Sequence, residues 1–491
     1  MATKRDLVEA HSFSRRRLVT AFVSGAPGGR EVEPARPGRS IVGGAALSVL
    51  LIAGAAVTGV FSDRPDSDWD APGLVISKEQ GAAYVILEDE EETGELPELR
   101  PVINITSAQL ILGAEGLEPR IVSQETIETR PLGEDVGILN APASLPATGD
   151  LVDTGWTACT GPDRGLTVRV SSQVGVAPTQ ETEAALVEVK GPDAGLWLVA
   201  TVPEGALGPA QAFRYAVPDE DSDQTEAFLR AVGLNGTAGA VKVPREWLDL
   251  FPRGGDLDAA AFDLDDLGEP APGQPDGVRV GDYTRSDAGT GFLVDDTGAL
   301  QPLSAFALAL WSNLDVSSDG RGGRQPRERD GLDGGAASEG YAAARWPQDL
   351  LSAVPGQTCA LLDASADRSP LVQLATSPDE DASADRVLDP SQRLVDVDPG
   401  AGAYVVSGDF EGLATDTVVE GEPAGSRFVV DQKGRANALV GADTPELLGY
   451  GAYAAPLVPS TWLDLFDAGV ALSQEAALCP PQPEGAEQTC G

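Results

Sequence analysis

The sequence predicts an α+β protein: one N-terminal transmembrane helix, then an elongated ectodomain of four small αβ repeat units around a central, mainly-β domain with pseudo-twofold symmetry. Three observations predict this fold. One uncharged apolar run lies near the N-terminus, the rest of the chain repeats its own motifs in order, and a cysteine begins the strand-rich middle of each half. The 491 residues are enough for roughly two to four ordinary domains.

The apolar run comprises residues 41–61 and follows a basic segment, residues 1–40, that contains Arg15, Arg16 and Arg17. At about 1.5 Å per residue, a helix of this length crosses a hydrocarbon core of about 30 Å. A cleaved signal peptide is the alternative, but its apolar core is usually only about 7–15 residues long. The positive charges before the run place the N-terminus in the cytoplasm. We therefore expect a single-pass protein of the cytoplasmic (inner) membrane, with its large C-terminal domain outside.

The formal charge of −43 is distributed unevenly, because the chain after residue 40 holds 26 basic and 73 acidic residues. A surface this acidic repels the phosphate backbone of nucleic acids, which argues against DNA or RNA as partners. Solubility or salt tolerance accounts for the same excess equally well.

All four cysteines, Cys159, Cys359, Cys479 and Cys490, follow the apolar run, where disulfides can form. None belongs to a CxxC pair, and the single histidine, His11, lies in the cytoplasmic segment. The composition therefore argues against an extracytoplasmic zinc site and against a histidine-dependent catalytic triad.

The ectodomain resembles itself over its whole length. VPREWLDLF (Val243–Phe251) recurs as VPSTWLDLF (Val458–Phe466), and GLWLV at Gly195 recurs as GAYVV at Gly402. Together with the two middle cysteines, these matches have offsets of 200, 207 and 215 residues, which rise steadily along the chain. An ordered series of this kind predicts an ancient duplication.

A finer repeat predicts the elements within each half. An apolar strand runs into an acidic turn closed by glycine, which is typical of a β-hairpin, in FLVDDTG (Phe292–Gly298), FVVDQKG (Phe428–Gly434) and YVILEDEEETG (Tyr84–Gly94). Each unit later reaches a proline followed three residues on by Leu or Trp, and proline is favoured in the first turn of a helix. The four pairs are Pro142/Leu145, Pro244/Trp247, Pro347/Leu350 and Pro459/Trp462. We interpret the tryptophans as core residues, with ligand-binding aromatics as the alternative.

These patterns divide the chain. The boundaries are 1–40 for the cytoplasmic segment, 41–61 for the transmembrane helix, 62–80 for a linker, 81–146, 205–258, 280–352 and 410–473 for repeat units 1, 2, 3 and 4, 155–200 and 356–407 for the two parts of the central β domain, and 474–491 for the tail.

Cys159 and Cys359 occupy equivalent positions in the two halves. A disulfide between them would lie near the pseudo-twofold axis, and closing a loop of this length would stabilise the fold by about 4–5 kcal/mol. Two buried free thiols are the alternative. Cys479 and Cys490 flank the tail and are a possible second pair that closes a small loop.

Three common catalytic motifs, GxxxxGK[ST], GxSxG and HExxH, are absent, so the sequence gives no positive evidence for a catalytic centre. The acidic stretches 219–224 and 377–384 lack the spacing of a calcium-binding loop. Ser312–Gly340, rich in Gly, Asp and Arg, is expected to be a solvated surface loop. We therefore expect no catalytic residue, no metal site and no cofactor, and favour a scaffold or binding protein.

The motifs resemble those of EccB, the single-pass component of the type VII (ESX) secretion machinery of actinobacteria. The resemblance covers nearly the whole chain. It rests on Phe13-x-x-Arg16-Arg17, the single apolar run, GAAYVIL (Gly81–Leu87), PVINITSAQLILG (Pro101–Gly113) and Trp156-x-x-Cys159.

This resemblance implies a disulfide at the position of Cys159 and Cys359, and assembly with the EccC motor ATPase, EccD, EccE and the mycosin protease. It also implies self-association of ectodomains outside the membrane. Members of the family are sometimes labelled ATPases, although this sequence has no Walker lysine. We expect a structural core subunit of a type VII secretion complex; a cell-envelope (peptidoglycan) binding module and a nucleotide hydrolase are the alternatives.

Overall fold

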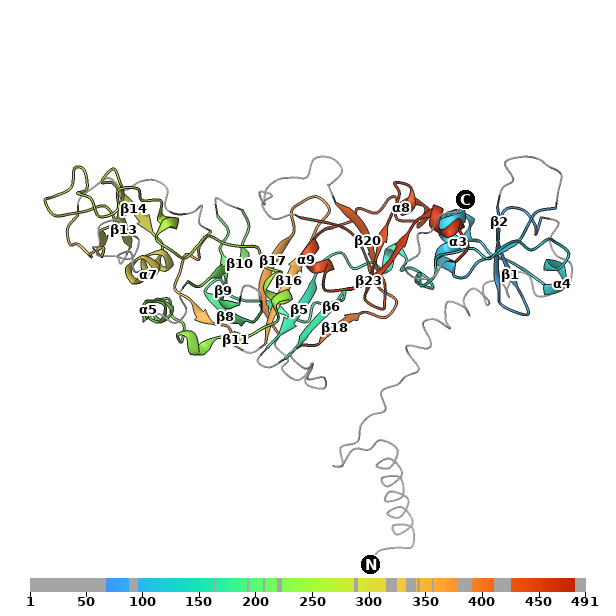
Figure 1. Cartoon of the computed structure of the whole chain (residues 1–491), viewed down its shortest axis with the longest axis horizontal. Coiled ribbons are helices and arrows are strands. Elements are labelled where there is room, and N and C mark those ends of the chain that lie inside the picture. The colour runs from blue at the N-terminus through green and yellow to red at the C-terminus, as the bar shows by residue number, and fades with distance from the viewer. Residues whose placement is uncertain are drawn as a thin grey trace, which may run out of the picture. The chain divides into compact units, whose positions relative to one another are not determined.

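The computed structural model describes residues 68–87, 96–161, 164–191, 194–205, 208–218, 223–286, 290–314, 325–332, 341, 345–355, 357–377, 391–409 and 425–481. Within these residues the chain forms many small sheets and a few short helices (Figure 1), which confirms the coarser part of the predicted fold class. No helix in this part of the chain is long and apolar enough to cross a membrane. Residues 1–40 with Arg15, Arg16 and Arg17, and the predicted span 41–61, lie outside the described residues.

The first sheet has the strand order β3-β2-β1-β4, with β1 antiparallel to β2 and parallel to β4. The linker was predicted to extend to residue 80, whereas β1 lies inside that range and buries Leu74 and Val75. A short apolar run buried on both faces has no alternation that reveals a strand, so the boundary was placed too late. The elements are β1 Gly73–Ser77, β2 Ala83–Ile86, β3 Arg100–Pro101, α3 Ile105–Leu112, a 3₁₀ helix Ala114–Leu117, β4 Arg120–Val122 and α4 Gln124–Ile127.

The central sheet has six strands in the order β18-β6-β5-β16-β17-β7. Its two middle strands, β5 and β16, are antiparallel, and each half of the chain contributes three of the six. The strands are β5 Trp156–Thr160, β6 Leu166–Val170, β7 Ala177–Pro178, β16 Thr358–Asp363, β17 Leu371–Thr376 and β18 Arg393–Val397, and a 3₁₀ helix, Thr148–Asp150, precedes β5.

Two five-stranded sheets flank it. One has the order β10-β9-β8-β11, with β15 also paired to β8, and the other has the order β22-β19-β20-β21-β23. The strands β8, β9 and β19, which were assigned to the central domain, therefore belong to these flanking sheets. The first group comprises β8 Glu183–Val189, β9 Gly195–Val202, β10 Gln211–Ala216, α5 Asp223–Ala231, a 3₁₀ helix Thr237–Gly239, β11 Val241–Lys242, α6 Arg245–Leu248 and β15 Ser352–Ala353. The second comprises β19 Ala403–Gly408, β20 Ser426–Val430, β21 Arg435–Leu439, α8 Thr444–Leu447, β22 Leu457–Pro459, α9 Ser460–Leu463, β23 Asp467–Leu472 and α10 Gln474–Leu478.

A three-stranded sheet, β12-β13-β14, completes the set. Its hairpin β13–β14 and the hairpin β20–β21 are the two predicted from FLVDDTG and FVVDQKG. Asp295 and Asp431 each accept hydrogen bonds from the backbone N–H groups two and four residues later, and each turn closes on a glycine with φ near +75°: 79° at Gly298 and 72° at Gly434. The remaining elements are a 3₁₀ helix Ala260–Phe262, β12 Tyr283–Arg285, β13 Gly291–Val294, β14 Leu300–Leu303 and α7 Ala305–Asn313.

Only two of the four proline motifs begin a helix. Pro244 and Pro459 are the N-cap residues of α6 and α9, whereas the chain after Pro142 and Pro347 forms bends. After Pro142 a second proline, Pro146, disfavours helical backbone at the residue before it. The prediction of a helix after the proline is therefore wrong for repeat units 1 and 3.

Two cores join segments from opposite halves of the chain. In one, Leu110 of α3 shares a cluster with Val429 and Leu472, and Gln109 Nε2 donates to Leu448 O at 3.0 Å. In the other, residues of 196–234 pack with residues of 293–351, as in the edge-to-face contact of Phe228 with Phe306. The ranges predicted as repeat units 1 and 4 therefore share one core, and those predicted as units 2 and 3 share another.

Part of the predicted surface loop Ser312–Gly340 is fastened to the fold. Tyr283 of β12 donates its N–H to Arg327 O at 3.1 Å and accepts from Arg329 N at 2.7 Å. The Arg329 guanidinium donates through Nε to Asp282 Oδ2 at 2.8 Å, and Asp282 is buried. Residues 325–332 are mostly exposed and form no helix or named strand, as expected of a surface loop, but these hydrogen bonds fasten them to β12. The charged residues in the sequence do not reveal that one of them pairs with a buried carboxylate.

Candidate functional site at the central disulfide

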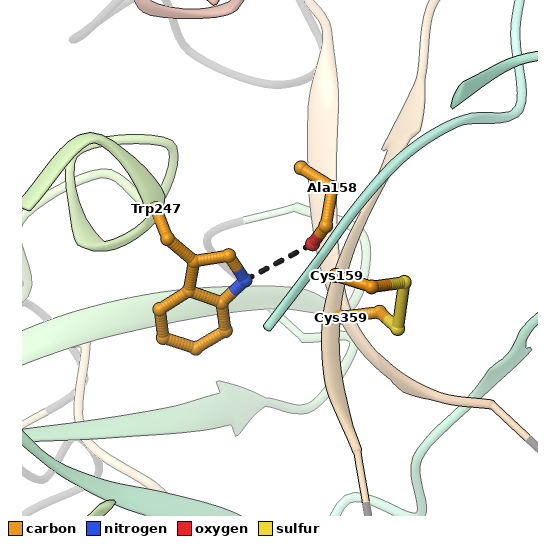
Figure 2. Close-up of a disulfide and its surroundings, with 4 residues drawn as sticks. All are labelled: Ala158, Cys159, Trp247 and Cys359. Carbon is orange, nitrogen blue, oxygen red and sulfur yellow. Dashed lines mark hydrogen bonds between the residues drawn. A yellow bond between two sulfur atoms is a disulfide. The ribbon is translucent and has the colours of Figure 1, made fainter. Parts of the chain in front are cut away.

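Cys159 and Cys359 form a disulfide between β5 and β16, the two middle strands of the central sheet (Figure 2). The strand register places them directly opposite each other, although 200 residues separate them in the sequence. Because side chains alternate between the faces of a strand, both sulfur atoms lie on the same face. There the bridge packs with Leu361 and Ala375, and Cys359 is fully buried.

The opposite face of β5 and β16 belongs to the central core, to which Trp156, Ala158 and Leu362 contribute. Trp247 of α6 packs on this face, and its indole Nε1 donates a hydrogen bond to Ala158 O at 3.0 Å (Figure 2). Ala158 directly precedes Cys159. β5 is therefore held covalently to β16 and by a buried hydrogen bond to α6.

Ion pairs fix the position of α6. Asp249, at the end of α6, accepts from Arg245 Nε at 2.9 Å and from Arg214 Nη1 of β10. The Arg214 guanidinium also lies 5.8 Å from the centre of the Trp197 ring on β9. Charge-assisted hydrogen bonds of this kind are stronger than neutral ones. They join α6 to the flanking sheet that contains β9 and β10.

The second half has the matching tryptophan without the matching bond. Trp462 of α9 is fully buried, as Trp247 is, which agrees with the interpretation of both as core residues. Its indole N–H has no acceptor among the described residues. The tryptophan-to-strand bond therefore belongs to the first half, although the sequence motif is nearly the same in both.

Tyr215 of β10 directly follows Arg214 and is fully buried. Burial raises the pKa of the Tyr215 hydroxyl, which donates to Arg345 O. In the part of the chain that the structure describes, no group of three His, Cys, Asp or Glu side chains is placed to hold a metal ion. A pocket beside β8 and β15 has a volume of about 60 Å³, below the roughly 300 Å³ at which ligand pockets begin. What the site provides is a covalent link between β5 and β16, the disulfide of Cys159 and Cys359.

Sequence reasoning identified the cysteines and Trp247 but missed the contacts that connect them. Ala158 acts through its backbone carbonyl, which no sequence pattern reveals. Asp249 had a usable signal, because the same aspartate recurs in the second copy of WLDLF as Asp464. Cys479 is disulfide-bonded, and Cys490, its predicted partner, lies outside the described residues.

Comparison with known proteins identifies the family. The profile described as "Type VII secretion system ESX-1, transport TM domain B" matches residues 1–481. The protein named ESX-3 secretion system ATPase EccB3 of Mycolicibacterium smegmatis is 29% identical over 487 residues, covering 91% of this chain and 85% of that protein. ESX-1 secretion system ATPase EccB1 of Mycobacterium tuberculosis is 29% identical over 174 residues, so the match spans 33% of each.

Solved structures show the same fold. The EccB3 dimer from the ESX-3 core complex has a TM-score of 0.58 at 22% identity, covering 83% of this chain and 99% of that one. A chain of the intact ESX-5 inner membrane complex has a TM-score of 0.59 at 18% identity, covering 100% and 98%. The family resemblance seen in the motifs is thereby confirmed, and the chain belongs to the EccB family of type VII secretion systems.

Proposed function

We propose that this chain is a structural core subunit of a type VII secretion complex in the cytoplasmic membrane, and that its ectodomain mediates assembly outside the membrane. The observation that carries the proposal is the family match over residues 1–481. The described body supports it, because the disulfide and the shared cores join the two halves of the ectodomain.

The ectodomain is the product of a duplication, with four repeat units about a pseudo-twofold axis at the disulfide. The register of β5 and β16 supports this proposal. Ala158 pairs with Ala360, and Thr160 pairs with Thr358. With the repeat offset of 200, Ala158 corresponds to Thr358 and Thr160 corresponds to Ala360. Each first-half residue therefore pairs with the repeat equivalent of the other, which is the relation that a twofold axis between Cys159 and Cys359 produces.

One helix, residues 41–61, crosses the membrane, with residues 1–40 inside and the ectodomain outside. Arg15, Arg16 and Arg17 contribute to that orientation, because positive segments are retained in the cytoplasm. The partners are the EccC motor ATPase, EccD, EccE and the mycosin protease, together with further copies of this chain. Solved relatives with the same fold come from an EccB3 dimer and an ESX-5 inner membrane complex, which supports both kinds of contact.

Affinity purification of the tagged full chain from membranes in mild detergent tests the proposal. Co-recovery of a P-loop motor ATPase and a multi-span membrane protein is the expected result. A chain with residues 41–61 exchanged for an unrelated span is the matched control, because it keeps the ectodomain and separates its contacts from those of the helix. Recovery of the wild-type chain as a lone monomer under every condition would overturn the proposal.

Nucleotide hydrolysis is a second candidate, because the relatives are named ATPases. The chain has no GxxxxGK[ST] motif to cradle phosphates, which weighs against it. An ATPase assay across successive purification steps distinguishes the two. Activity that follows this chain at constant specific value would favour hydrolysis, and activity that separates from it would exclude hydrolysis.

A further inference from the structure

We propose that Arg120 and Arg130 form an arginine clamp on residues Trp69–Pro72, and that this clamp is the joint through which the membrane span is coupled to the folded ectodomain. The inference rests on the proposed membrane topology.

Arg130 holds the first two residues of the segment. Its Nη2 and Nε donate to Asp70 Oδ2 at 2.6 Å and 3.1 Å. Its guanidinium carbon lies 5.3 Å from the centre of the Trp69 ring. The side chains of Arg130 and Asp70 are 22% and 23% exposed, so the ion pair is shielded more than an ordinary surface pair.

Arg120 holds the next two residues. Its Nη1 donates to Ala71 O at 2.5 Å, and its Nη2 donates to Pro72 O at 2.8 Å. Gly73 follows at once with φ +138°, and a Cβ there would lie 3.1 Å from Arg120 Nη2. The backbone at Gly73 therefore lies close to the Arg120 guanidinium, and a larger residue at this position would press against it. Together, the four successive residues Trp69–Pro72 contact two guanidinium groups.

The clamp is anchored in the fold. Arg120 belongs to β4, where it pairs in register with Val75 of β1. Trp69 is buried in a small core with Val75, Val122 and Ile127. The arginines thus connect the first described residues of the chain to a packed sheet rather than to a loose surface.

The short distance to the membrane gives the clamp its role. Seven residues, 62–68, separate the predicted end of the span from Trp69. Fully extended, they reach no more than about 25 Å. A displacement of the span relative to the ectodomain therefore loads Trp69–Pro72 first. Arginine suits this task, because its guanidinium presents N–H donors from several nitrogens in a rigid planar fork, whereas lysine donates from a single nitrogen on a flexible stem.

Hydrogen exchange of the full chain in lipid nanodiscs tests the clamp. Arg120→Lys combined with Arg130→Lys should make amides of residues 69–77 exchange at least about tenfold faster, since charge-assisted hydrogen bonds contribute more than that factor. Amides of β5 and β16 should be unchanged. Arg100→Lys is the matched control, because Arg100 lies in the same sheet and, among the described residues, its side chain pairs with the exposed Glu98. Unchanged exchange in residues 69–77, or equal acceleration by the control, would overturn the proposal.

Coupling has its own readout. A fluorophore on Glu125→Cys, an exposed site on α4, reports how freely the ectodomain rotates relative to the disc. The double variant should lower the residual anisotropy, and unchanged anisotropy would refute coupling through the clamp. If the double variant fails to fold, Asp70→Asn removes one charge and should give the same local effect; unchanged exchange and anisotropy in that variant would overturn the proposal. Co-purification with partners should survive in the clamp variants. If the wild-type chain itself recovers no partners, that result counts against the proposed function and leaves the clamp untouched.

Discussion

Substitution of the two matching tryptophans by phenylalanine should have unequal effects. Trp247 donates to Ala158 O beside the disulfide, whereas the indole N–H of Trp462 has no acceptor among the described residues. Both side chains are fully buried. Phenylalanine keeps an aromatic ring at each position and removes the N–H, so the pair isolates the contribution of that group.

The magnitude follows from the two environments. At Trp247 the substitution removes a hydrogen bond that contributes about 0.5–1.5 kcal/mol. At Trp462 it removes a buried donor whose desolvation costs about 1–3 kcal/mol, so part of the packing loss is offset. The packing loss itself is similar for two fully buried rings. Trp247→Phe should therefore reduce the free energy of unfolding by about 1.5–4.5 kcal/mol more than Trp462→Phe does.

Urea unfolding of each variant in the full chain, followed by far-ultraviolet circular dichroism with disulfides intact, gives the comparison. Protection of the amides around Ala158 against hydrogen exchange should fall in Trp247→Phe and not in Trp462→Phe. Equal losses of stability, or a larger loss for Trp462→Phe, would refute the reasoning from the unpaired indole.

Three further predictions concern the fastened body and its hairpins. Replacing Cys159 and Cys359 together by Ser should lower stability by about 2–5 kcal/mol in thermal melts, and a reductant should shift the wild type more than this variant. Gly298→Ala should destabilise the β13–β14 hairpin far more than Gly273→Ala in the same assay: both have positive φ, but the Cβ would lie 1.8 Å from a backbone oxygen at Gly298 and in open space at Gly273. Equal effects would contradict the steric argument. Burial raises the pKa of Asp295, but the hydrogen bonds that its carboxylate accepts lower the pKa by more, so the net pKa lies below its ordinary value. The stabilisation it gives is then present at neutral pH and lost as the pH falls through that lowered pKa. The melting-temperature gap to Asp295→Ala should therefore narrow as the pH is lowered below the ordinary aspartate pKa of about 3.9, and a gap that stays constant throughout the acid range would count against it.

Local patterns in the sequence predicted local structure well. The hairpin at FLVDDTG forms because Asp295 bonds the turn and Gly298 adopts a positive φ, both of which depend on residues within one short segment. The burial of Trp247 likewise follows from a motif of nine residues.

Arrangements between distant segments were not predictable in the same way. The core shared by α3 with β20 and β23 depends on which halves pack together, and apolar side chains carry no label for their partner. The bond from Trp247 to Ala158 O depends on a backbone atom. Arg329 looked like a solvated loop residue because its partner, Asp282, lies 47 residues earlier in the chain.

Native mass spectrometry of assemblies released from the membrane tests the central claim most directly. The full chain should be detected in a complex that holds several copies of itself together with a motor ATPase. Detection of the chain only as a monomer, under detergent conditions that preserve other membrane complexes, would contradict the account.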